Sequence, residues 1–192
     1  MSPIPLGILA ASGVEVAAGG AFDLLTTTLV SSNTSSVVFS NLVSNYASSY
    51  KHLQLRMVLR TNQANDNLGN VRIEVNGVQQ DYNSHELYGD ATGDYSTTSG
   101  TSTFMMLSGA TTKAQSGAAK YALTITDIYE PFTTNKKTTF MSMIGGFANT
   151  EEKVALASGL FNYTNAVDSI EIYVPSASWV SGCRFSLYGM GA

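Results

Sequence analysis

Hydrophobic and polar residues alternate with a period of two along most of the chain. The clearest example is residues 50–61, "YKHLQLRMVLRT", where Leu53, Leu55, Met57 and Leu59 would lie on one face of an extended chain. The short "VRIEV" segment and the C-terminal "CRFSLYGMGA" alternate in the same way. This period is that of a β-strand with one buried face, so we predict a strand in each segment.

Other segments rich in β-branched and aromatic residues bring the predicted strands to eight or more, separated by turn-rich stretches. They are "AFDLLTTTLV", "SSVVFSNL", "TFMMLSG", "KYALTITDIYE", "NKKTTFMSMIGGF", "EEKVALASGLFNY" and "VDSIEIYVPS". Asn76-Gly77 predicts a tight turn, and "NLVSNYASSY" is the one segment that indicates a helical turn. We expect Phe185 and Leu187 of the last strand in the core. The pattern predicts an all-β fold for residues 21–192, an antiparallel β-sandwich or jelly-roll-like domain.

The composition of residues 1–20 predicts an extended N-terminal arm. Two prolines exclude a helix start, four glycines loosen the segment, and its apolar residues are too few to form a core. The arm either folds back on its own domain or docks on a neighbouring subunit. The candidate docking residues are Pro3, Ile4, Pro5, Leu6, Ile8 and Leu9.

Charge and cysteine content narrow the possible classes of protein. Charged residues make up 12% of the 192 residues and the net charge is −4, whereas ordinary soluble domains carry about 25% charged residues. A basic surface for nucleic acid is therefore not expected. Cys183 is the single cysteine, which excludes an internal disulfide and fits synthesis in a reducing cytoplasm. No apolar run approaches the length of a membrane span, and no Lys or Arg precedes position 51, so we expect neither membrane insertion nor a secretory signal.

No constellation of catalytic or metal-binding residues stands out. Ser84, His85 and Glu86 are consecutive, and consecutive residues of an extended chain point to opposite sides, so they cannot form one relay. One cysteine and two histidines are too few for a zinc site, and "NQANDNLGN" and "DATGD" do not match a twelve-residue calcium loop. We therefore predict no enzyme activity, no catalytic residue, no cofactor and no metal.

Residues 81–102 predict a long polar loop that combines aromatic rings with carboxylates. Such a loop suits either a glycan-binding surface or a contact with another subunit, because both use the same chemistry. The candidate contact residues are Tyr82, His85, Tyr88, Asp90, Asp94 and Tyr95.

Several segments together resemble a family of small bacteriophage virion structural proteins. They are "PLGILAASG", "SSVVFSNL", "YKHLQLRMVLRT", "VRIEVNG", "YNSHELYG" and the ending "CRFSLYGMGA", which is similar to the Phe-Ser-Leu-Tyr-Gly ending of those proteins. The resemblance covers nearly the whole chain, and "YKHLQLR" and "FSLYG" are its most specific parts. It implies a non-enzymatic β-sandwich on the particle surface, commonly oligomeric.

The resemblance and the residues together lead to one expected function and two alternatives. We expect a short tail or head fibre or appendage protein, made in the host bacterial cytoplasm and exposed on the virion surface. Its expected partners are other virion proteins (capsid, portal-tail or fibre subunits), copies of itself in a homo-oligomer, for which we expect a trimer, and a host surface glycan. The alternatives are a capsid decoration (cement) protein and a glycan-binding or glycan-cleaving module.

Overall fold

The computed structural model describes residues 21–64, 68–113, 120–148 and 152–191, which form twelve strands and one short helix, α2 (Leu42–Tyr46). The larger sheet contains, in spatial order, β1 (Phe22–Leu29), β12 (Arg184–Met190), β3 (His52–Leu59), β8 (Ala122–Tyr129), β9 (Thr138–Phe147), β10 (Glu152–Phe161), β5 (Tyr82–Asp90) and β6 (Gly93–Ser102). The smaller sheet contains β2 (Ser36–Phe39), β11 (Ile170–Tyr173), β4 (Leu68–Val75) and β7 (Met105–Thr112).

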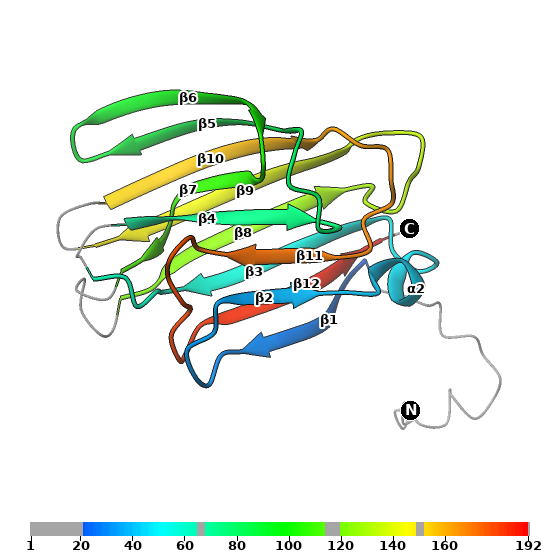
Figure 1. The fold of residues 1–192 in the computed structure, drawn as a ribbon, viewed down its shortest axis with the longest axis horizontal. Helices are drawn as coiled ribbons and strands as arrows, with labels where there is room; N and C mark the ends of the chain where they lie inside the picture. The colour runs from blue at the N-terminus through cyan, green and yellow to red at the C-terminus, as the bar shows by residue number, and fades with distance from the viewer. Residues whose placement is uncertain (1–20, 65–67, 114–119, 149–151, 192) are drawn as a thin grey trace, which may run out of the picture.

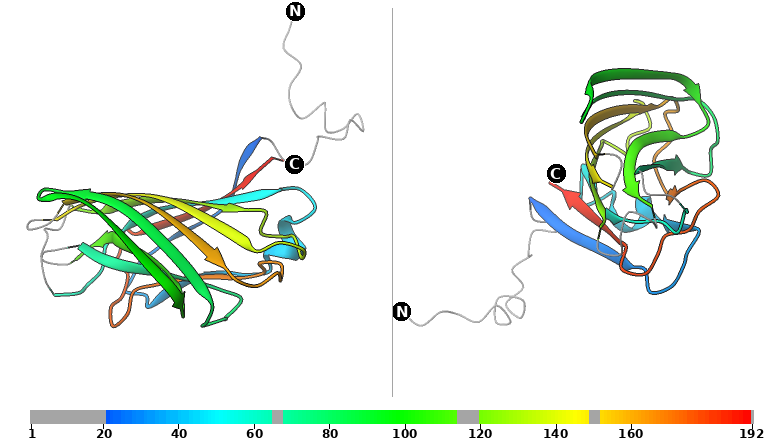
Figure 2. Two further views of the ribbon diagram at one scale, coloured as in Figure 1. Left: turned by 90° about the horizontal axis from the view of Figure 1, so that it is seen from above. Right: turned by 90° about the vertical axis from the view of Figure 1, so that its left-hand side faces the viewer.

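The two sheets form two layers, and neighbouring strands in each are antiparallel (Figures 1 and 2). The predicted all-β antiparallel sandwich is therefore confirmed, as is the helical turn, which is α2. In the described ranges no helix has the length and apolar character to cross a membrane. The predicted arm, residues 1–20, lies outside the described residues.

The core is built from the inward positions of the alternating strands. The four apolar residues of β3 predicted to share one face are fully buried, and so are Phe185 and Leu187 of β12, as predicted. Trp179 is fully buried and links the layers. Its ring nitrogen donates a hydrogen bond to the Ile172 carbonyl of β11 (3.2 Å), and its ring packs edge-on against Phe185 of β12 (centroids 5.2 Å apart).

The prediction of a loop over residues 81–102 is wrong, because this segment forms the hairpin β5–β6. Strand β5 pairs along its whole length with β10, and β6 pairs with β5. Gly, Asp and Asn are depleted in strands and Ser is frequent in turns, so the local composition indicates a loop. The hydrogen bonds to β10, about 70 residues away in sequence, outweigh that local preference. The hairpin projects beyond β7, the edge strand of the smaller sheet (Figure 1).

The predicted Asn76-Gly77 turn is confirmed and directs the chain between layers. Both residues have positive φ (54° and 67°), and the Val78 amide donates to the Val75 carbonyl (2.9 Å). The turn lies between β4 of the smaller sheet and β5 of the larger one. A glycine in the second position suits this geometry, since positive φ is strained for most residues.

Candidate functional site

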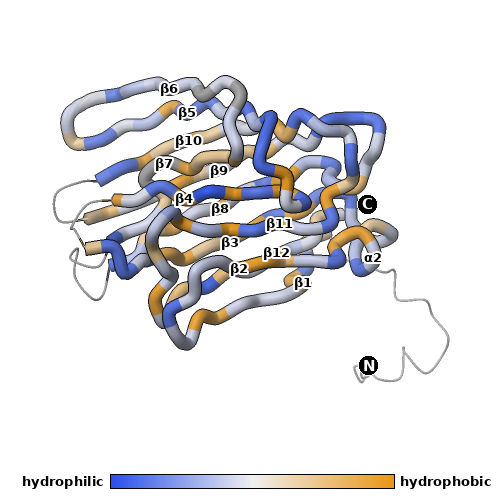
Figure 3. Tube along the Cα trace, in the orientation of Figure 1, coloured by the Kyte–Doolittle hydropathy of each residue, from blue (hydrophilic) through white to orange (hydrophobic). Residues whose placement is uncertain are grey.

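The outer face of the larger sheet, turned away from the smaller sheet, is apolar over four neighbouring strands. Strands β8, β9, β10 and β5 each alternate buried and outward residues, and apolar residues recur along them (Figure 3). Seven large apolar side chains are more than half exposed here, and we call them the apolar face: Leu87, Leu123, Met141, Met143, Phe147, Val154 and Leu156.

Strand register joins these side chains into a continuous surface. Met143 of β9 pairs with Ile125 of β8 on one side and with Leu156 of β10 on the other, and Leu156 pairs with Leu87 of β5. Directly paired residues have Cβ atoms about 4.5–5.5 Å apart, so these four form one row across four strands. An exposed apolar surface of this width is typical of an interaction site.

A hollow lies beside this row. Gly145 of β9 pairs with Leu123 of β8 and Val154 of β10, so no side chain fills the centre. A Cβ at Gly145 would meet no heavy atom within 4 Å. The hollow has a volume of about 480 Å³, and Phe147 is among its lining residues. A projecting side chain of a partner would fill such a space, as anchor residues do in protein interfaces.

Polar and aromatic groups border the apolar face on the side of β3. The Arg56 guanidinium lies over the rings of Phe22 and Tyr188, 4.8 Å from each centroid. Gln54 donates a hydrogen bond to Asp127 (2.6 Å). An apolar centre with a polar rim is the usual composition of a protein–protein interface.

The six residues predicted as one glycan or subunit contact do not form a single surface. Tyr82 is 1% exposed and belongs to the core, so its assignment as a surface contact is wrong. His85 is exposed on the outer side of β5, and the Asp94 carboxylate lies over the same side. Asp90 accepts hydrogen bonds within the turn of the hairpin, and those from Thr92 hold the pKa of its carboxyl group below the usual value.

The two remaining residues of that set lie on the inner side of the hairpin. The rings of Tyr88 and Tyr95 stack with centroids 5.1 Å apart. The Lys153 ammonium lies 3.8 Å from the centroid of Tyr88 and forms a buried ion pair with Glu86. These rings therefore pack against a charged pair within the protein, on the opposite side of the sheet from His85.

The consecutive residues Ser84, His85 and Glu86 do not come together as one relay, because they belong to strand β5 and point to alternating sides of the sheet. His85 points outward from β5, whereas Glu86 points inward and is engaged by Lys153. The Nδ1 atom of His52 accepts a hydrogen bond from the Glu130 backbone amide (3.0 Å). Among the described residues, no group of three or more His, Cys, Asp or Glu is placed to hold a metal ion.

The apolar face was missed at the sequence level, although its signal is present. In "KVALASGLF" of β10, Val154 and Leu156 alternate with Ala155 and Ala157, so both faces of the strand are apolar. Two-sided apolar strands are typical of sheets covered on both faces. Within the described part of the chain, the smaller sheet covers one face of the larger sheet, and the second apolar set is exposed.

Comparison of the chain with protein-family models, with curated proteins and with solved structures gave no match.

Proposed function

We propose that this protein is a structural component of a bacteriophage particle, exposed on the virion surface, without enzyme activity. The observation that carries the proposal is the apolar face. A chain with 12% charged residues and seven large apolar side chains exposed on one sheet has little protection against association. Repeated contact with neighbouring subunits would cover such a surface permanently, as in a symmetric assembly.

We infer further that the sandwich is a jelly roll, which supports this proposal. Strands β1, β12, β3 and β8 are consecutive in the larger sheet, and β2, β11, β4 and β7 make up the smaller one. The chain crosses between the sheets at eight connections: β1–β2, β2–β3, β3–β4, β4–β5, β6–β7, β7–β8, β10–β11 and β11–β12. The hairpins β5–β6 and β9–β10 widen the larger sheet. Jelly rolls are typical of viral capsid and lectin domains.

The assembly we propose is a short tail or head fibre or appendage, built as a homo-oligomer with a trimer as the expected state. Residues 1–20 would dock it to capsid, portal-tail or fibre subunits, and a host glycan would be its outside partner. A capsid decoration protein is the second candidate, because a broad apolar face suits repeated contact with a shell. Particles lacking a decoration protein would burst at lower temperature, whereas particles lacking a host-binding appendage would stay intact and adsorb poorly.

Replacing one side chain at the centre of the apolar face tests the proposal. Met143→Lys places a charge in the row formed with Leu156 and Leu87, where the wild-type side chain is 62% exposed. The matched control is Val38→Lys, which changes a 53% exposed residue on the smaller sheet. Both variants should fold with the melting temperature of the wild type, since exposed sites tolerate charge.

We expect Met143→Lys to reduce the copy number per particle at least tenfold and Val38→Lys to leave it unchanged. The measurement is quantitative mass spectrometry of particles purified after replacement of the gene. Light scattering of the purified proteins should give a smaller species for Met143→Lys alone. Wild-type copy number for a folded Met143→Lys protein would refute the role of this face in assembly.

A further inference from the structure

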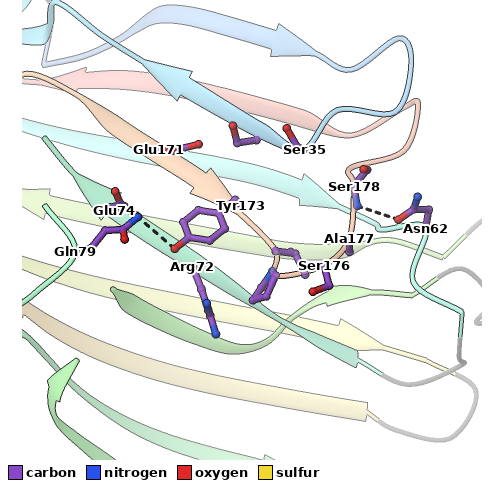
Figure 4. A pocket seen from close by; sticks show the side chains of 13 residues that line it. Ser35, Asn62, Arg72, Glu74, Gln79, Glu171, Tyr173, Ser176, Ala177 and Ser178 are labelled. Carbon is purple, nitrogen blue, oxygen red and sulfur yellow. Dashed lines mark hydrogen bonds between the residues drawn. The ribbon is translucent and has the colours of Figure 1, made fainter. Parts of the chain in front are cut away.

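A polar groove lies on the outer face of the smaller sheet, which is the opposite side of the sandwich from the apolar face (Figure 4). Its volume is about 600 Å³, within the range of about 300–1,000 Å³ common for ligand sites. The outward side chains of β2, β11 and β4 contribute to its lining, together with the segment that follows β11.

Strand register brings the groove residues together from three distant parts of the chain. Tyr173 of β11 pairs with Ser36 of β2 on one side and with Arg72 of β4 on the other. In the next outward row, Glu171 of β11 pairs directly with Glu74 of β4. Figure 4 shows the Tyr173 side chain of β11 beside Glu74 of the neighbouring strand β4.

The Glu74–Glu171 pair is unfavourable for the sheet itself. Like charges directly opposite on paired strands are destabilising, and Glu74 is only 4% exposed, so solvent screens it poorly. Its Oε2 atom accepts hydrogen bonds from Gln79 (3.1 Å) and from the Tyr173 hydroxyl (3.4 Å). Residue pairs that destabilise the fold, such as two facing carboxylates, are expected at functional sites.

Three side chains of the groove, Arg72, Tyr173 and Asn62, can donate hydrogen bonds to a ligand and are held by neighbouring groups. Arg72 lies 3.8 Å above the Phe104 ring centroid, which fixes its guanidinium at the groove. Burial and the nearby Glu74 carboxylate raise the pKa of Tyr173, which keeps its hydroxyl protonated at neutral pH. The Asn62 side-chain carbonyl accepts from the Ser178 amide (2.9 Å), which orients its amide group at the other end.

From this geometry we propose that the groove binds a neutral saccharide. Carboxylates accept hydrogen bonds from sugar hydroxyls, guanidinium and amide groups donate to them, and an aromatic ring supplies apolar area for the sugar face. Arg72, Glu74 and Glu171 give the charged lining a net −1, which disfavours sialylated and other acidic sugars. This saccharide site deepens the proposed contact with a host glycan and rests on that proposal, but it is tested separately from the assembly role, because the groove and the apolar face lie on opposite sides of the sandwich.

The test is binding of a panel of sugars to the purified full-length protein. Saturation-transfer NMR and calorimetry would use methyl glycosides of glucose, galactose, mannose, rhamnose and N-acetylglucosamine, with sialyllactose as the acidic probe and glucosamine as the cationic probe. We expect at least one neutral glycoside to bind and sialyllactose to bind more weakly than that glycoside, because the lining carries a net −1 charge. Glucosamine shows whether the groove selects a cation over a neutral sugar.

Variants in the groove locate the site. Glu74→Gln and, as a milder change, Glu171→Gln should each weaken binding of that glycoside at least tenfold. The matched control is Glu152→Gln, an exposed carboxylate of β10 in the larger sheet, which should leave binding unchanged. Because it removes one of two facing charges, Glu171→Gln should also raise the melting temperature, so lost binding would not reflect unfolding.

Three results would overturn the proposal: no glycoside binding to the wild type, wild-type affinity in both folded groove variants, or tighter binding of a charged probe than of every neutral glycoside. Copy number in particles gives an independent readout. If the groove variants assemble normally but lose sugar binding, the saccharide site holds. If they bind sugar as the wild type does, it fails whatever the outcome for Met143→Lys.

Discussion

Tyr82 provides a sharp test of the packing between the two sheets. Its hydroxyl accepts a hydrogen bond from the Val75 amide (2.8 Å) and donates one to the Val78 carbonyl (2.9 Å), so it joins β5 to the turn after β4. The substitution Tyr82→Phe keeps the ring and its packing against Phe161, whose centroid is 5.2 Å away. Only the hydroxyl is lost, and no large cavity forms.

The expected loss of stability comes from the two backbone groups left behind. A buried donor or acceptor without a partner costs about 1–3 kcal/mol, and Val75 is fully buried, whereas the bond to Val78 is partly exposed. We therefore expect the free energy of unfolding to fall by about 2–3 kcal/mol. The control Tyr95→Phe removes a hydroxyl from a side chain that is 43% exposed and should change stability by less than about 0.5 kcal/mol.

Urea unfolding at neutral pH, followed by Trp179 fluorescence, measures both variants. If Tyr82→Phe is as stable as Tyr95→Phe, the argument from the buried hydroxyl is wrong. A second measurement is the free energy of unfolding as the pH is raised into the alkaline range. Burial raises the pKa of Tyr82 in the folded protein above its value of 10.0 in the unfolded chain. The folded state therefore keeps its proton where the unfolded state loses it, and stability falls as the pH rises above about 10. Tyr82→Phe should lose less stability over that pH range.

Two further predictions use single sites. A Cβ at Gly189 would lie 2.4 Å from the Tyr50 ring, so Gly189→Ala should lower the free energy of unfolding by about 1–3 kcal/mol. Gly145 has open space around it, so Gly145→Ala should lower that free energy by less than about 1 kcal/mol. Urea unfolding measures both variants, and equal losses would contradict the packing at Gly189. Cys183 is fully buried, and burial raises the pKa of its thiol, so it should react with a thiol reagent only in denaturant, and fast reaction of the folded protein would contradict its burial.

Strands with a regular period of two were predictable, because the alternation of apolar and polar residues within the strand is enough to identify them. In β3 the buried positions alternate without a break from Leu53 to Leu59, and in β12 the predicted core residues Phe185 and Leu187 are fully buried, with Ser186 between them buried as well. The hydrophobic effect acts on each residue, so the buried face follows from the sequence alone. The Asn76-Gly77 turn was predictable for a similar reason, since few residues tolerate positive φ in succession.

The two candidate surfaces were not predictable, because they depend on which strands are neighbours. The alternation in "VRIEV" places Arg72 and Glu74 on one face of a strand, but their partners Tyr173 and Glu171 lie about 100 residues away in sequence. The composition of residues 81–102 predicts a loop, whereas pairing of β5 with β10 makes this segment the hairpin β5–β6. The polar sequence neighbours of Tyr82 predict a surface position, whereas strand pairing turns its side chain into the core.

The position of the two surfaces on one sandwich limits how they can work together. The apolar face belongs to the larger sheet and the groove to the smaller one, and the core separates them. A subunit or shell protein that covers Met143 and Leu156 therefore leaves Glu74 and Tyr173 facing away from the contact. Such an arrangement favours a protein held by one side while its other side samples ligands. It also predicts that sugar affinity is the same for the free protein and for the assembled particle, since neither surface has to open for the other to be occupied.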